Sequence, residues 1–208
     1  MTMVAYDNLA AHLWNARINF ASDTIKLAIC TSSYTPARAT HDYFDDITNQ
    51  LANGNGYTTG GATLASKTLT LTAANSWGTS RANSTAYVLG DVYRPATGNG
   101  FLYECITAGT SNASIPTFTT VVGDDFTDGT AVFSCRGSAV LQVDSADVSW
   151  ASSTISTART FVLYKDTGTA STSPLIAYDQ LGADASATTN TTLTYQVQAL
   201  GYILIFIN

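Results

Sequence analysis

Short segments in which apolar and polar residues alternate recur along most of this chain, and they constrain its fold more than any other feature. Side chains of a β-strand point to opposite faces in turn, so an alternation of period two predicts a strand with one buried face. Segment 24–31 is an example, because Ile25, Leu27 and Ile29 occupy every second position. Further strands are expected over 64–72, 101–107, 131–136, 139–144, 160–165, 175–181, 191–198 and 201–207. Many short strands separated by turns indicate a mainly β fold, an antiparallel β-sandwich or barrel, and not a doubly wound α/β fold.

One N-terminal helix is expected, from Ala5 to Arg17. Apolar residues recur there at steps of three and four, which gives a single apolar stripe. The stripe contains Tyr6, Leu9, Ala10, Leu13 and Trp14. Such a stripe usually lies against the main sheet of its own domain. The alternative is a docking helix for a neighbouring subunit, with Tyr6, Leu9, Leu13 and Trp14 as its contact residues.

The segment 76–137 differs from its surroundings in amino-acid composition and in its turn signals. It contains two of the three cysteines, many of the loop glycines and an Asp128-Gly129 turn, and strand patterns end before it and resume after it. We therefore expect a small inserted β module over 76–137, within a discontinuous host β domain formed by 1–75 and 138–208. Exposed loop tips accept such insertions because the host core stays intact.

Charge is scarce in this chain, since charged residues make up 12% of it, against roughly 25% in a typical domain. Nine lysines and arginines face 15 acidic residues, for a net charge of −6. Such a balance leaves little to neutralise phosphates, so we expect no nucleic-acid partner. The cores of protein interfaces are depleted in charge. The low charge content therefore predicts that much of the surface is buried in an assembly.

Neither a signal peptide nor a membrane span is expected. The N-terminal segment lacks a basic stretch followed by an apolar run. The longest apolar stretch, 202–207, is far shorter than the about 20 residues that cross a bilayer. We therefore expect synthesis in a cytoplasm and no membrane partner.

No catalytic motif assembles, so we expect no enzyme and no cofactor. His12 and His41 have no neighbours at metal-ligand spacing, so no metal site is expected either. Two clusters of aspartates could hold calcium or act as acid and base, although solvated loop acids that cap turns are the preferred interpretation. These clusters are Asp42, Asp45 and Asp46, and Asp124, Asp125 and Asp128. A glycoside hydrolase would need a fixed acid–base pair, which the sequence does not reveal.

Three cysteines, Cys30, Cys105 and Cys135, do not imply a disulfide framework. Cys105 and Cys135 fall on two expected strands of the inserted module, and a disulfide between them would contribute roughly 3–4 kcal/mol. The alternative is two buried free thiols, which a protein made in a cytoplasm favours.

Five motifs in the host part resemble, in order, a family of bacteriophage virion structural proteins. They are YDNL (6–9), DTIKLAICTSSYTP (23–36), HDYFDDITNQ (41–50), GYTTGG (56–61) and KDTGTA (165–170). The resemblance implies a head-decoration (cement) or tail-associated protein without enzymatic activity. We expect a decoration protein that bridges capsid subunits, with the major capsid protein and its own copies, as a trimer, for partners. The protein would be made in the bacterial host cytoplasm and reside in the virion, with the insert projecting outward.

The inserted module resembles small β-rich modules of phage fibres and of some carbohydrate-active proteins. The residues that carry this resemblance are 87–92, Arg94-Pro95, 100–105, 108–111, Pro116 and 128–133. Such modules often expose aromatic rings on which sugars stack, and the candidates here are Trp77, Tyr87, Tyr103 and Phe118. The resemblance thus implies an alternative function, a tail- or fibre-associated adhesin whose insert binds host-surface glycans. The competing interpretation is that Tyr103, Phe118 and Phe133 fill the core of a domain that has little area to bury.

Overall fold

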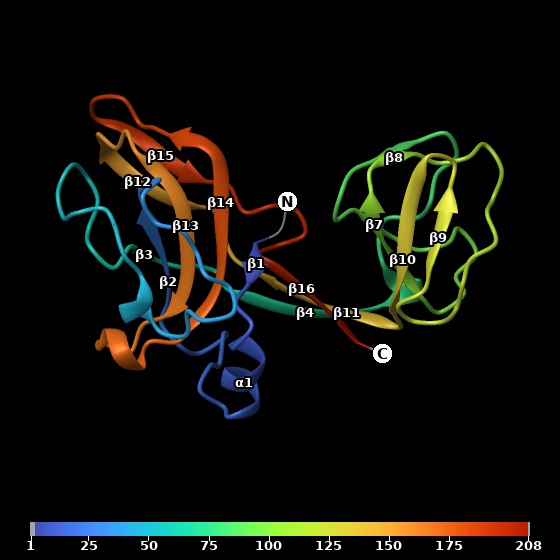
Figure 1. Ribbon diagram of the computed structural model, residues 1–208, viewed down its shortest axis with the longest axis horizontal. Coiled ribbons are helices and arrows are strands. Elements are labelled where there is room, and N and C mark those ends of the chain that lie inside the picture. Colours follow the sequence, from blue (N-terminus) through green and yellow to red (C-terminus); the bar gives the residue numbers. More distant parts are fainter. Residues whose placement is uncertain (1–2, 208) are drawn as a thin grey trace. The chain divides into compact units, whose positions relative to one another are not determined.

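The computed structural model describes residues 3–207, and its fold is mainly β with one short α-helix (Figure 1). The strand pairs described are antiparallel, which confirms the predicted fold class. Of the two predicted forms the barrel is not found, since no sheet closes on itself within 3–207.

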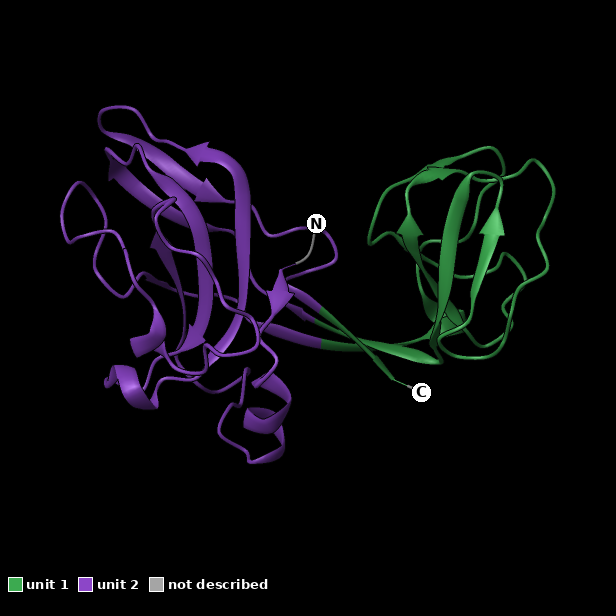
Figure 2. Cartoon of the chain, viewed as in Figure 1, with its two compact units in different colours: residues 1, 70–142, 204–208 green, residues 2–69, 143–203 purple. Residues whose placement is uncertain are grey.

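The chain divides into two compact units (Figure 2). Unit 1 contains residues 70–142 and 204–207, and unit 2 contains residues 3–69 and 143–203. The predicted insert, 76–137, lies inside unit 1, which also takes in residues on either side of it. The boundaries fall within three strands of one sheet, whose order is β16-β11-β4. These strands are β4 (Thr68–Ala73), β11 (Ala139–Asp144) and β16 (Ile203–Ile207).

A five-stranded sheet forms the centre of unit 2, in the order β1-β14-β13-β2-β3. Its strands are β1 (Val4–Ala5), β14 (Leu175–Ala185), β13 (Ala158–Lys165), β2 (Ile25–Cys30) and β3 (Ala62–Thr63). The alternation in segment 24–31 predicts a half-buried strand, whereas β2 is buried on both faces. The reason is its place in the sheet, because β2 lies between β13 and β3 and both faces of this part of the sheet are covered.

The two faces of the sheet are covered by different parts of unit 2. On one face, Phe161 of β13 packs against Trp150 and Tyr195, with ring centroids 6.1 and 4.6 Å away. Those two residues belong to a second, two-stranded sheet, which makes this side sandwich-like. Its strands are β12 (Val148–Ser153) and β15 (Thr191–Tyr195). The next residue of β13, Val162, points the other way and joins a second core cluster with Tyr6 and other residues.

The N-terminal helix is shorter than predicted. Helix α1 spans Leu9–Trp14, whereas the expected helix spans residues 5–17. Residues Val4 and Ala5 form strand β1 instead, and the N–H of Tyr6 donates to the carbonyl of Ile176. Tyr6 fits the helical stripe in the sequence because it is apolar and correctly spaced, but it is buried as a core residue outside the helix.

Unit 1 contains a four-stranded sheet in the order β6-β7-β10-β9 and a pair of short strands, β5 and β8. The bounds are β5 (Ala86–Tyr87), β6 (Val92–Tyr93), β7 (Leu102–Thr107), β8 (Gly109–Thr110), β9 (Asp125–Asp128) and β10 (Ala131–Gly137). Tyr87, Tyr93, Tyr103 and Phe133 form most of its core. The fold also contains three short 3-10 helices, η1 (Phe44–Asp46), η2 (Ala74–Ser76) and η3 (Ala170–Thr172).

Candidate functional site in unit 1

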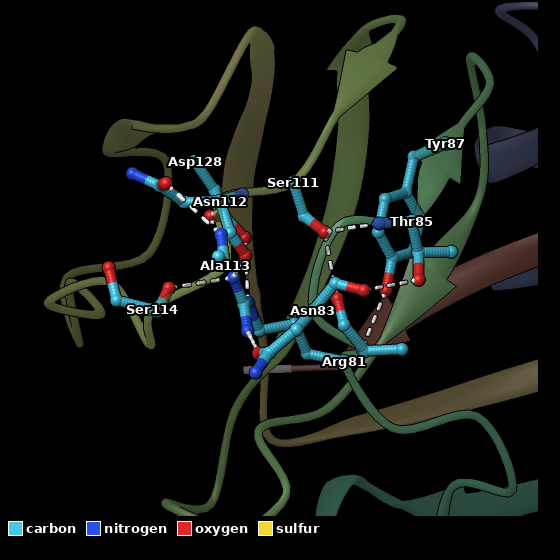
Figure 3. Close-up of polar contacts among 10 residues, drawn as sticks. Arg81, Asn83, Thr85, Tyr87, Ser111, Asn112, Ala113, Ser114 and Asp128 are labelled. Atoms are coloured by element: carbon cyan, nitrogen blue, oxygen red, sulfur yellow. Dashed lines mark hydrogen bonds and ion pairs between the residues drawn. The ribbon is translucent and has the colours of Figure 1, made fainter.

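Unit 1 buries an arginine–aspartate pair, Arg81 and Asp128 (Figure 3). The contact is bidentate, with Arg81 Nε 2.8 Å from Asp128 Oδ2 and Nη2 3.0 Å from Oδ1. The Arg81 side chain is 2% exposed and that of Asp128 is 0% exposed. Buried ions are tolerated only when their remaining hydrogen-bonding groups also find partners.

Those remaining groups are satisfied by Asn83 and by segment 112–114. Arg81 Nη2 also donates to the carbonyls of Asn112 (2.6 Å) and Ser114 (2.9 Å), and Nη1 donates to Asn83 Oδ1. The Asp128 carboxylate accepts a third hydrogen bond, from the N–H of Asn112 to Oδ1 at 2.9 Å. The hydrogen bonds with Asp128 raise the pKa of Arg81 above its ordinary value. The ion pair therefore holds segment 112–114 against β9.

A glycine next to Asp128 makes this geometry possible. Gly129 has φ +69°, and a Cβ on it would lie 2.1 Å from the carbonyl oxygen of Thr110. The predicted Asp128-Gly129 turn is confirmed, since it joins β9 to β10. The interpretation of Asp128 as a solvated loop acid is wrong, because its carboxylate faces a buried guanidinium.

A second set of hydrogen bonds fixes the segment that follows Arg81 (Figure 3). Ser111 Oγ accepts from the N–H of Thr85 at 3.0 Å and donates to the carbonyl of Ala82 at 2.7 Å. The N–H of Ala82 donates to the hydroxyl of Tyr87 at 2.9 Å. The side chains of Ser111 and Tyr87 thereby fix the backbone of residues 82–85 next to Arg81.

The pocket beside Arg81 has a volume of about 550 Å³, within the range of small-molecule sites. Its apolar wall contains Phe118, Pro95, Ala96 and Ile115, and its polar groups are Asn83, Thr97, Asn99 and Arg81. No carboxylate lines it, and Asp128 offsets the charge of Arg81. We call this space the neutral pocket. It suits an uncharged ligand with one apolar face and several hydrogen-bonding groups.

Sequence reasoning missed Arg81, Asn83 and Asn99, because none belongs to a recognisable motif. The one available signal is the scarcity of charge, which makes an arginine inside a small β module conspicuous. Its partner Asp128 is 47 residues away, a distance that no local pattern spans.

Three of the four predicted sugar-stacking residues do not reach the surface. Trp77, Tyr87 and Tyr103 are all buried. Tyr87 packs edge-on against Phe133 at 5.2 Å, and Trp77 donates its indole N–H to the carbonyl of Val92. Buried rings cannot stack on a sugar. The competing interpretation, that Tyr103, Phe118 and Phe133 fill the core, fits the core cluster, in which Tyr103 and Phe133 are buried and Phe118 packs against them. Phe118 differs, because it is half-buried and lines the neutral pocket.

Of the two alternatives for Cys105 and Cys135, the structure has the favoured one, buried free thiols, and no disulfide joins them; Cys30 is also a free buried thiol. Strands β7 and β10 are neighbours, but Cys105 lies opposite Phe133, and Cys135 lies opposite Tyr103. Burial raises the pKa of each thiol, to about 12 for Cys30. Such thiols are poor nucleophiles and inert structural groups.

The predicted docking residues of the helix divide into two pairs. Tyr6 and Leu9 are buried in unit 2, so they cannot contact a partner. Leu13 is 42% exposed and Trp14 is 92% exposed. Leu13 and Trp14 are therefore the large apolar residues that α1 exposes.

The first aspartate cluster is formed by Asp42, Asp45 and Asp46. Its preferred interpretation is loop acids that cap turns, and Asp46 does bind backbone N–H groups. Asp46 Oδ2 accepts from the N–H groups of Asp42 (2.7 Å) and Tyr43 (3.1 Å). Asp42 Oδ1 lies 2.5 Å from Nε2 of the buried His12. Within residues 3–207, no group of three or more histidine, cysteine, aspartate or glutamate residues is arranged to hold a metal ion.

Comparison of the chain with protein-family models, with curated proteins and with solved structures finds no match. Among the described residues, no helix has the length and apolar character needed to span a membrane.

Proposed function

We propose that this chain is a non-enzymatic structural protein of a bacteriophage virion, a capsid decoration protein that binds the major capsid protein and its own copies. The observation that carries this proposal is the exposure of Trp14 beside Leu13 at the end of α1. Tryptophan is enriched among the residues that dominate interface energies. In a chain with so few charges, an almost fully exposed tryptophan marks a surface suited to burial by a neighbour.

The phage part of the proposal rests on the five host motifs, all of which lie in unit 2. Residues from different motifs contact one another in its core. The hydroxyls of Tyr6 and Tyr34 are 3.0 Å apart, and the rings of Phe44 and Tyr164 are stacked at 3.9 Å. Tyr164 directly precedes the last motif. The motifs thus describe one shared core, which supports their use as the signature of a fold.

The test is binding of the recombinant chain to expanded capsids that lack it. We expect saturable binding, weakened about tenfold or more by Trp14→Ser with an unchanged melting temperature. Leu89→Ser is the control, because Leu89 is an exposed apolar residue of unit 1. A chain that does not bind such capsids, or a Trp14→Ser variant that binds like the wild type, would contradict the proposal. The trimer is tested by the mass of the purified chain in solution.

A second candidate function is a tail- or fibre-associated adhesin that binds host-surface glycans. The observation that favours it is the neutral pocket, where half-buried Phe118 lies with the neutral polar side chains of Asn83, Thr97 and Asn99. Sugars combine apolar ring faces with hydroxyl groups, which such a lining can match.

Glycan-array binding tests this candidate. Phe118→Ala should abolish it, but Phe118 also packs against Tyr103 at 5.2 Å, so this variant weakens the core. Thr97→Trp is the second variant, because Thr97 is exposed and a larger side chain there fills the pocket. Binding that survives both substitutions, or an array without signal, would eliminate glycan binding at this pocket.

A further inference from the structure

Unit 2 contains a second pocket, of about 350 Å³, with a different character. Its polar lining consists of Arg17, Tyr43, Lys165, Thr167, Ser171 and Thr172. Arg17 follows α1, Lys165 ends β13, and the three hydroxyl residues belong to the loop around η3. No carboxylate lines the pocket. We call it the cationic pocket.

Arg17 stands apart from the other cations of the chain. Among the described residues, six of the nine lysines and arginines form ion pairs with carboxylates. These six are Lys26, Arg38, Arg81, Arg136, Arg159 and Lys165. Of the other three, Lys67 donates to the carbonyl of Asp23, and Arg94 donates to backbone carbonyls.

Within residues 3–207 the guanidinium of Arg17 donates only to a neutral group, the hydroxyl of Tyr43. A single bond from Nη1 leaves most of the five N–H donors of its guanidinium free. Because no carboxylate faces it, the charge of Arg17 remains available to a ligand.

Lys165 adds positive charge and fixes the backbone beside it. Its Nζ lies 2.9 Å from Asp23 Oδ2 and donates to the carbonyl of Arg17 at 2.8 Å. The ion pair offsets part of the lysine charge, whereas the second bond anchors the main chain that carries Arg17. The guanidinium is therefore the principal anion-binding group of the pocket.

The opposite wall is built of hydroxyl groups that hold one another. Thr167 Oγ1 and Thr172 Oγ1 are 2.6 Å apart and share a hydrogen bond. Each hydroxyl also lies within hydrogen-bonding distance of the carbonyl oxygen of Thr169, to which either can donate. A hydroxyl has one donor and two acceptor sites, so Thr172 retains an acceptor site for a ligand, whereas Thr167 Oγ1 already has three partners, the third being Ser173 Oγ at 3.1 Å. Their mutual hydrogen bonds hold these hydroxyl groups in position before a ligand binds, which lowers the entropic cost of binding.

We propose that the cationic pocket binds a small sugar that carries one oxyanion, either a carboxylate or a phosphate. The oxyanion accepts charge-assisted hydrogen bonds from the planar fork of Arg17. The sugar hydroxyls bond to Ser171 and Thr172. The pocket volume lies within the range of small-molecule sites and leaves room for a ring beside the oxyanion. This inference does not rest on the proposed virion function, since none of its observations uses Leu13 or Trp14.

Calorimetric titration of the full chain tests the proposal with four probes: glucuronate, glucose 6-phosphate, glucose and inorganic phosphate. We expect saturable binding of glucuronate or glucose 6-phosphate, and the tighter of the two identifies the oxyanion. Glucose lacks the charge and should not bind. Inorganic phosphate lacks the ring and should bind at least several-fold more weakly than the sugar.

Two variants assign the binding to this pocket. Arg17→Gln should weaken it about tenfold or more, since it removes charge-assisted hydrogen bonds. Ser171→Phe keeps the charge and fills the space, so it should also abolish binding. Arg17 and Ser171 are both exposed, so the melting temperature should stay unchanged. Arg38→Gln is the matched control, because Arg38 is an exposed arginine of the same unit outside the pocket lining.

Three results would overturn the proposal. They are the absence of binding by both acidic sugars, binding that Arg17→Gln and Ser171→Phe leave unchanged, and phosphate binding as tight as that of glucose 6-phosphate. Because none of these measurements uses capsids, their failure would leave the virion proposal standing.

Discussion

Asp128→Leu should strongly destabilise unit 1, because it leaves the guanidinium of Arg81 buried without a counter-ion. The substitution keeps a similar volume but removes all three hydrogen bonds that the carboxylate accepts, two from Arg81 and one from Asn112. Breaking a buried pair by removing one partner costs about 3–5 kcal/mol. Whole domains are stable by only about 5–15 kcal/mol, so the loss is a large part of what holds unit 1 folded.

Urea unfolding followed by hydrogen exchange measures this effect locally. Amides of β7 and β10 should exchange faster in Asp128→Leu, whereas amides of β2 and β13 in unit 2 should keep their protection. The matched control is Glu104→Gln, which breaks the half-exposed pair of Glu104 with Arg136, 27% and 35% exposed. Partly exposed pairs contribute about 0–1 kcal/mol, so the control should change little.

The double variant Arg81→Met/Asp128→Leu separates the uncompensated charge from the loss of the pair. It should recover most of the stability lost in Asp128→Leu, because apolar replacements of a whole buried pair are often neutral. The carbonyls of Asn112 and Ser114 lose their donor in this variant, but both residues are exposed, so water can replace it. A single variant as mild as Glu104→Gln, or a double variant less stable than the single one, would refute the reasoning.

Three further predictions concern the turn, the thiols and the tyrosines. Gly129→Ala should destabilise unit 1 by about 1–3 kcal/mol or more in urea unfolding, since its φ is +69° and the new Cβ meets the Thr110 carbonyl. In the native chain Cys30 should not react with an aromatic disulfide reagent at neutral pH, whereas without reductant the denatured chain should show all three cysteines reactive. Burial raises the pKa of Tyr57 and of Tyr202 from 10.0 to about 12. The stability from their neutral forms is complete below pH 10.0 and is lost as the pH rises toward about 12, so an alkaline titration of stability should fall in that interval.

The longer strands of unit 2 could largely be predicted from the sequence, because apolar and polar side chains alternate along them over several residues. Segment 160–165, for example, lies within β13, and 191–198 contains β15 with its end misplaced by three residues. Strand β12 was missed although Val148 and Trp150 alternate, because serines and an alanine fill most of the strand. Strand β9 was missed because it begins and ends with aspartate, a residue that strands disfavour.

The helix and the neutral pocket could not be predicted for a different reason. The spacing of Tyr6 satisfies a helical stripe and a core position equally well, and only its hydrogen bond to Ile176 decides between them. The pocket depends on Arg81 and Asp128, whose meeting requires the whole sheet of unit 1. Local patterns specify strands, whereas this site depends on contacts between residues that are far apart in the sequence.

Arg81 and Arg17 count equally in the composition of the chain, but Arg81 is buried and Arg17 is exposed. Asp128, Asn83 and two backbone carbonyls accept hydrogen bonds from Arg81 inside unit 1, so its charge is offset there and the residue stabilises structure. Arg17 is exposed, and its guanidinium meets no carboxylate among the described residues and donates only to Tyr43. In a chain of net charge −6, an anion is repelled at long range. Binding at Arg17 must therefore come from direct contact, which requires the hydroxyl wall of the cationic pocket as well as the charge. This is why filling the pocket with Ser171→Phe should abolish binding even though the arginine remains.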